Sequence, residues 1–244
     1  MRETLSDKAY RAIKADIITC EFKPGQQIAQ PHLAERYDIG ETPIREALHR
    51  LAQEGLVESV PRYGYVVTPI SYSNVVDIYE VRLVLESATA RIAAVRGSSD
   101  DLDRIVASQA FDYRTNDRES YLEFLSRNSA FHCQVALASG NDRLLKMIAR
   151  LHDEATRVFH LGLQLQGDVG LMRQEHVLIA NAIRDRDGDQ AESLMHDHIA
   201  RAQARVLDAL SQHFGIRRVR PTPGDRPSSS TSGASNAQVP QSTE

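Results

Sequence analysis

Residues 42–68 read TPIREALHRLAQEGLVESVPRYGYVVT and contain the signals of a helix followed by a β-hairpin. Thr42 is a good N-cap residue, and Pro43 then takes the first helical position, where its missing N–H costs nothing. Gly55 stands where a left-handed C-terminal cap belongs. Beyond it, residues 56–60 and 65–68 have the composition of two short strands around a proline- and glycine-containing turn.

Two helical segments precede this helix. Ser6 can cap the first, which ends before Pro24-Gly25, and the second covers residues 31–37. A tight turn at residues 38–41 then leads into the helix at Thr42. The order helix, helix, turn, helix, hairpin predicts a winged helix-turn-helix. The apolar face of the first helix consists of Ala9, Tyr10, Ile13 and Ile17.

The rest of the chain has a different composition. From Ser71 to Phe214 there is no proline, and apolar residues recur with helical spacing almost continuously. We therefore predict a mainly α protein, with a winged helix-turn-helix domain at residues 1–70 and an all-α helical-bundle domain at residues 71–214. Residues 215–244 are rich in Pro, Ser, Thr, Gly and Gln, so we expect a disordered tail.

Composition excludes several classes of protein. The chain has 244 residues and 41% apolar content, and it has no apolar run near the eighteen or so residues of a membrane span. Residues 1–8 lack the apolar core of a signal peptide, and two cysteines, Cys20 and Cys133, are too few for a disulfide framework. We expect a cytoplasmic protein.

Three histidines fall on the apolar stripes of three different predicted helices. They are His132, His176 and His198, and Asn128 lies one turn before the first of them on the same face. Imidazoles are costly to bury unless something binds them, and a divalent metal is a common binder. His196 projects to nearly the opposite side of its helix from His198. Core histidines held by ordinary hydrogen bonds are the alternative.

Both parts of the chain resemble known proteins. Residues 5–69 closely resemble the DNA-binding domain of GntR-family transcription regulators, and the helical part resembles the ligand-binding domain of the FadR-type branch of that family. The first match rests on Pro24-Gly25, Leu33-Ala34-Glu35, residues 42–48, Leu51, Gly55-Leu56-Val57 and Gly64. The second rests on residues 82–86, Phe131-His132, residues 139–141, Glu175-His176 and residues 195–199.

The resemblance implies a DNA-binding surface. Arg45 matches the family's recognition-helix arginine, Thr42 a position that contacts phosphate or base, and Gly64 the wing-tip glycine that enters the minor groove. We add three neighbouring polar side chains as candidates: His49, Arg50 and Arg62. Two-fold symmetric proteins read symmetric sites, so we expect a homodimer on a pseudo-palindromic operator in double-stranded DNA.

Two departures and the charge count qualify this expectation. The family usually has Ser-Arg where this chain has Gly40-Glu41, and an arginine where it has Pro31. An acid at Glu41 repels phosphate and can accept a hydrogen bond from cytosine, so operator sequence and affinity should differ from those of relatives. Residues 1–70 contain nine basic and ten acidic residues, a net charge of −1, so the DNA-binding signal comes from the motif alone.

The resemblance also favours a metal centre held by Asn128, His132, His176 and His198. Its ion would be a divalent transition metal, Zn²⁺, Ni²⁺ or Mn²⁺, whose identity stays open. The family usually has aspartate at position 128. Three neutral imidazoles and one amide leave the charge of the ion uncompensated, which should favour an anionic ligand.

The resemblance implies a regulator, a repressor by our reading, controlled by a small organic acid. A carboxylate could complete the coordination of the metal while Arg82 neutralises a second acid group, although Arg82 can equally pair with Glu86 at i,i+4. A metal-dependent hydrolase with the same histidines is the alternative. It would need a general base, and we expect Glu175 and Asp197 to point away from the histidine faces. A purely structural helical module is the third reading.

Overall fold

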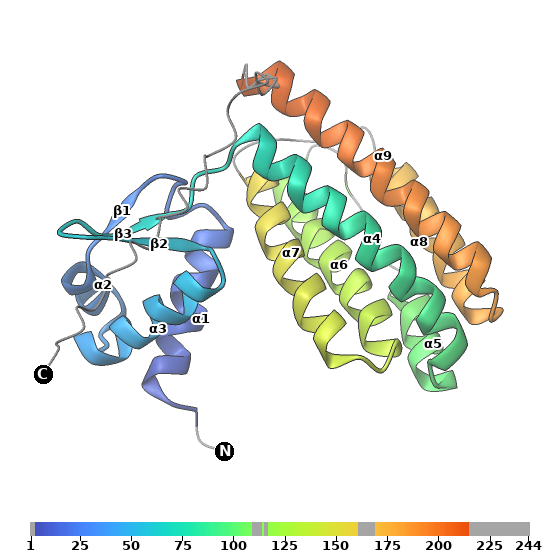
Figure 1. The fold of residues 1–244 in the computed structure, drawn as a ribbon, viewed down its shortest axis with the longest axis horizontal. Helices are drawn as coiled ribbons and strands as arrows, with labels where there is room; N and C mark the ends of the chain where they lie inside the picture. Colours follow the sequence, from blue (N-terminus) through green and yellow to red (C-terminus); the bar gives the residue numbers. More distant parts are fainter. Residues whose placement is uncertain (1–2, 109–113, 115–116, 161–168, 215–244) are drawn as a thin grey trace, which may run out of the picture.

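A computed structural model describes residues 3–108, 114, 117–160 and 169–214. It contains an N-terminal unit of three helices and a small sheet, and beside it a bundle of long helices (Figure 1). The mainly α class predicted from the sequence is confirmed. The predicted tail at 215–244 lies outside the described residues.

The N-terminal unit is a winged helix. Its helices are α1 (Leu5–Ile18), α2 (Gln30–Tyr37) and α3 (Glu41–Gln53), and its strands are β1 (Gln27–Ile28), β2 (Val57–Val60) and β3 (Gly64–Val67). The strands form an antiparallel sheet in the order β1-β3-β2. Fully buried apolar side chains of the three helices form its core: Ile13, Ile17, Leu33, Ile44, Leu48 and Leu51. The strand β1 was not predicted.

Two helix starts differ from the prediction. The cap of α1 is Thr4, which forms a reciprocal capping box with Asp7, so Ser6 lies inside the helix. The box satisfies two backbone donors at once, which a single serine cap cannot do. The cap of α3 is Gly40, so Thr42 and Pro43 are the second and third helical residues. Proline is tolerated there because the first-turn N–H groups have no partner within the helix.

The bundle consists of five long helices and the shorter α5. They are α4 (Tyr72–Arg96), α5 (Ser99–Ala107), α6 (Arg118–Ala138), α7 (Asp142–His160), α8 (Val169–Arg184) and α9 (Gly188–Phe214). The helices α4 and α9 lie side by side along their lengths (Figure 1). No helix in the described ranges combines the length and hydropathy needed to cross a membrane.

The first bundle helix, α4, is apolar on more than one side. One face is buried in the bundle and includes Ile78, Tyr79 and Ala90. The other face is exposed and also carries apolar side chains, at Val81, Val84, Ala88 and Val95. The spacing of this exposed stripe is close to seven residues per two turns.

The winged helix contacts the bundle through α7. Lys14 Nζ of α1 lies 2.7 Å from a carboxylate oxygen of Asp153. Arg157, which is buried, donates to the carbonyl of Thr68 just after β3 at 2.5 Å. Arg150 donates to the carbonyl of Gln53 at 3.3 Å. One helix of the bundle therefore touches the end of α3, the end of the wing and the middle of α1.

Gly97 at the end of α4 offers a test of this packing. A methyl group there would lie 2.8 Å from the Ala93 carbonyl oxygen and 2.9 Å from Leu102 Cδ2. We expect Gly97→Ala to lower the free energy of unfolding by about 1–3 kcal/mol, measured by urea denaturation. Gly170→Ala is the matched control, because a methyl group at that position meets no atom within 4 Å. Equal stability of the two variants would contradict the packing at the α4–α5 corner.

Candidate metal centre and DNA-binding face

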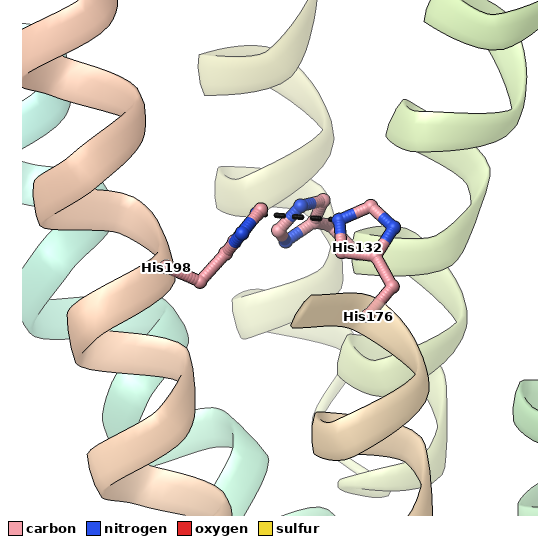
Figure 2. A group of neighbouring side chains, drawn as sticks. All are labelled: His132, His176 and His198. Carbon is pink, nitrogen blue, oxygen red and sulfur yellow. Dashed lines mark hydrogen bonds between the residues drawn. The ribbon is translucent and has the colours of Figure 1, made fainter. Parts of the chain in front are cut away.

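Three histidines from three helices meet inside the bundle. His132 of α6, His176 of α8 and His198 of α9 are all buried, and one ring nitrogen from each lies within 4.8 Å of the others. Nε2 of His176 is 3.2 Å from Nε2 of His198. Figure 2 shows the three rings pointing toward one another. The convergence predicted from the helical spacing is therefore present in the structure.

Two buried carboxylates lie behind these rings. Nδ1 of His198 donates to Glu175 at 2.6 Å, and Nδ1 of His132 lies 2.5 Å from a carboxylate oxygen of Glu86. A histidine that gives its Nδ1 proton to a carboxylate keeps the lone pair of Nε2, and metal-binding histidines usually have such a partner. We had expected Glu175 to point away from the histidines, and this was wrong. It is 6% exposed and also accepts from Arg201.

His132 is the histidine least satisfied by the protein. Its Nδ1 contacts a carboxylate oxygen of Glu86, but within the described part of the chain its Nε2 has no hydrogen-bond partner. A buried polar group without a partner costs about 1–3 kcal/mol. A cation bound between the three rings would remove this cost, so the donor set fits a divalent metal.

A second set of potential ligands shares His132. It adds Glu86 of α4 and His152 of α7, again within 4.8 Å. Here the guanidinium of Arg82 already contacts both, with Nε donating to Glu86 at 2.7 Å and a terminal nitrogen 3.1 Å from His152 Nε2, and His152 Nε2 itself lies 3.3 Å from Glu86. Arginine stays protonated in proteins, so it fills this position with positive charge. The three-histidine set is therefore the better metal candidate.

The same contacts answer the question left open for Arg82. It forms the i,i+4 pair with Glu86, and both side chains are buried. It also lines a cavity next to the histidines, together with Asn128, which is partly buried, and His198. His152 was missed by the sequence analysis, although it falls on the buried stripe of α7 between Ile148 and Ala155. His196 is exposed, as expected.

Burial fixes the charge states around the cluster. It lowers the pKa of His132 and of His198 to about 4, and it holds the pKa of His176 well below its usual value. Burial alone would raise the pKa of the two carboxyls. Arg82 nevertheless holds the pKa of Glu86 well below its usual value, and the hydrogen bond from His198 helps to lower that of Glu175 to about 2. At neutral pH the three imidazole rings are therefore uncharged and can donate a nitrogen lone pair to a metal, and the two carboxylates are negatively charged.

The proposed DNA contacts lie on the exposed side of α3 and on the turn between β2 and β3. Thr42, Arg45 and His49 are exposed on α3. A shallow depression brings Arg45 and His49 together with Arg50 and Tyr65. At the wing, Arg62 and Gly64 are exposed with φ of 68° and 84°, a conformation that favours glycine at the tip.

Several basic side chains of the winged helix are held by acids of the same chain. Arg50 pairs with Asp7 at 2.8 Å and lies over the ring of Tyr10, 4.1 Å from its centroid. Arg36 pairs with Asp16 at 2.6 Å. Among the described residues Arg45 has no ion-pair partner, so of these three arginines it is the best placed to contact DNA.

A winged helix joined to a helical bundle with a buried histidine cluster defines a DNA-binding transcription regulator. Residues 5–67 match the family of bacterial regulatory proteins of the gntR type, and residues 77–201 match the FCD domain. The chain belongs to the GntR family and carries an FCD domain. FCD domains can bind metals, and GntR-family regulators bind DNA and typically act as dimers.

Relatives and solved structures agree with this assignment. The chain is 29% identical over 209 residues to the transcriptional repressor GlaR of Escherichia coli, covering 84% of this chain and 90% of that protein. It is 24% identical to the Nta operon transcriptional regulator of Aminobacter aminovorans, covering 79% and 90%. The structure of E. coli McbR/YncC matches with a TM-score of 0.69 at 18% identity, covering 85% of this chain and 99% of that one. The two relatives are named as transcription regulators, and the matched gntR family consists of regulatory proteins, so the hydrolase alternative falls away.

The depressed histidine pKa values predict how stability depends on pH. Between pH 6.5 and about 4 the unfolded chain binds protons that buried His132 and His198 do not. The free energy of unfolding of the metal-free protein should therefore fall as pH falls, by up to about 1.4 kcal/mol per pH unit for each group. Urea denaturation with chelator present at pH 7, 6 and 5 measures this.

His198→Gln should reduce that pH slope, whereas the matched change at an exposed site, His196→Gln, should leave it as in the wild type. Equal slopes in all three proteins would mean that His198 is not held neutral by burial.

Proposed function

We propose that this protein is a repressor whose affinity for its operator is set by a small carboxylate bound at a metal centre in the helical bundle. The observation that carries the proposal is the buried cluster of His132, His176 and His198 beside a cavity, in which His132 Nε2 has no hydrogen-bond partner among the described residues. Two relatives, GlaR and RspR of E. coli, are named as repressors. We further propose that the protein is cytoplasmic and that the boundary between its two domains lies near residue 70.

The three imidazoles would hold the ion through nitrogen, with the amide oxygen of Asn128 as a fourth donor. Zn²⁺, Ni²⁺ and Mn²⁺ all accept such ligands. A bound ion would supply a positive centre that attracts a carboxylate. Glu86 and Glu175 support this arrangement because their negative charge lies behind two of the rings and partly balances the ion.

The exposed apolar stripe of α4 supports a homodimer. Val84 and Val95 are each 67% exposed and Val81 is 43% exposed, with Ala88 between them. A helix that is apolar on its outer as well as its inner face is usually covered on both. A second copy packed stripe to stripe would place two winged helices for a pseudo-palindromic operator.

The helix α7 supplies a route from the cavity to the DNA-binding unit. His152 faces the polar cluster, while the next residue, Asp153, pairs with Lys14 of the winged helix. Arg157, one turn further on, holds the end of the wing. If α7 can adopt two positions and the ligand has a higher affinity for one of them, ligand binding would shift α7 toward that position. The spacing of the winged helices, and with it the affinity for DNA, would then change.

The first test concerns DNA. We expect Arg45→Ala to weaken binding to the protein's own promoter region at least about tenfold in a gel-shift titration, because a bidentate contact to guanine contributes about 1–3 kcal/mol. Arg104→Ala is the matched control, since Arg104 is an exposed arginine of α5 far along the chain. If Arg45→Ala binds as the wild type does, Arg45 does not read the operator.

The second test concerns the metal. We expect His176→Ala and His198→Ala each to reduce bound metal to below stoichiometric amounts and to abolish the rise in melting temperature on adding Zn²⁺. His196→Ala, an exposed site two residues from His198, should retain both properties. Elemental analysis and thermal melts measure the two effects. A wild-type protein that purifies without metal and does not respond to Zn²⁺, Ni²⁺ or Mn²⁺ would contradict the proposal.

A further inference from the structure

The outer face of α4 carries an apolar stripe that is symmetric about its middle residue. Ala88 is exposed, and the exposed side chains of Val81 and Val95 lie seven residues before and seven residues after it. One residue further out on each side stands an exposed charge, Glu80 before the stripe and Arg96 after it. The two halves of the stripe are therefore alike in their apolar side chains and opposite in their end charges.

We propose that two copies of the chain pair antiparallel along α4, with Ala88 on the two-fold axis between them. This inference rests on the homodimer of the proposed function, and it names the residues that meet in it. In an antiparallel helix pair, a residue before the axis meets the residue that lies equally far after the axis in the second copy. Val81 of one copy then meets Val95 of the other, and Glu80 meets Arg96, each contact occurring twice.

The end charges of the stripe favour the antiparallel orientation. Within the described part of the chain neither Glu80 nor Arg96 takes part in an ion pair, so both charges are free to meet a second copy. A parallel pair would set each residue against its own copy, so glutamate would face glutamate and arginine would face arginine. Like charges brought together across an interface cost free energy, whereas the antiparallel pair brings opposite charges together at both ends.

The order of residues along the stripe favours this register over its neighbours. Sliding one helix past the other by one turn sets Val81 against Arg91 in one direction and Val84 against Arg96 in the other. Each of these pairs places an apolar side chain against a charge. In the proposed register Arg91 needs no partner from the second copy, because two acidic residues of α9 already pair with it.

The small side chain at the centre permits a close contact. Packed helices approach to about 8–10 Å between their axes, and the side chains at the contact set the distance within that range. Alanine at the axis allows the short end of the range. The valines on either side of Ala88 are then near enough to cover one another and leave water.

Cysteine cross-linking of the full-length protein tests the position of the axis. Only a residue close to a two-fold axis lies near its own copy, so Ala88→Cys should form a disulfide-linked dimer on mild oxidation. Val84→Cys, on the same stripe, is the matched control, because its two copies would lie about 12 Å apart along the helices, beyond the reach of a disulfide. We expect at least about tenfold more linked dimer from Ala88→Cys on non-reducing gels. The wild type, with Cys20 and Cys133, gives the background.

Reversal of the end charges tests the orientation. We expect Glu80→Arg and Arg96→Glu each to raise the dimer Kd at least about threefold in sedimentation equilibrium, because each puts like charges together at both ends of the stripe. The double variant Glu80→Arg/Arg96→Glu should return the Kd to within about twofold of the wild type. Arg104→Glu, at an exposed arginine of α5, makes the same charge change away from the stripe and should leave the Kd unchanged.

The outcomes separate this inference from the homodimer itself. A wild type that stays monomeric at every concentration overturns both. If the wild type is dimeric and Ala88→Cys gives no linked dimer above background, the axis lies elsewhere and only the inference is wrong. Equal cross-linking of Ala88→Cys and Val84→Cys would indicate a parallel pair and also overturn it. A double variant as weak as the single ones would remove the contact between Glu80 and Arg96, and with it the argument for the orientation. None of these results bears on the metal centre.

Discussion

The helical bundle depends on how a group of buried polar side chains contact one another. Five helices contribute to it, and each position must be in register, because a displaced partner would leave a charge or an imidazole alone in an apolar interior. Most of the contacts are of two kinds, an arginine paired with a glutamate and a glutamate paired with a histidine. The group consists of Arg82, Glu86, His132, His152, Glu175, His176 and His198.

This constraint also links the bundle to the winged helix. The backbone of α7 carries His152 toward the polar group and Asp153 toward Lys14, so the two contacts share one rigid element. Arg157 extends the same helix to the base of the wing. A change around the buried group that moves α7 must therefore move the attachment of the DNA-binding unit, with few intervening side chains.

The sequence predicted the helices and the three histidines because both follow from a period of 3.6 residues. It failed where a contact depends on a second element. Glu175 was misplaced because α8 is covered by α5, α4 and α9, so its buried arc is wider than a single stripe. The strand β1 exists only because Gln27 and Ile28 pair with β3, and two residues carry no period. The Glu86 contact with His132 likewise depends on how α4 and α6 pack.

The internal ion pairs of the winged helix affect how the protein searches the chromosome. Arg50 is tied to Asp7, Arg36 to Asp16, and Lys14 to Asp153 and Glu54, so these three cations are less available to displace counterions from phosphates. Affinity for random DNA grows with the number of phosphates neutralised. Pairing these cations inside the chain therefore lowers the attraction of the winged helix to non-operator DNA, and a molecule held less strongly there diffuses freely for a larger share of its search.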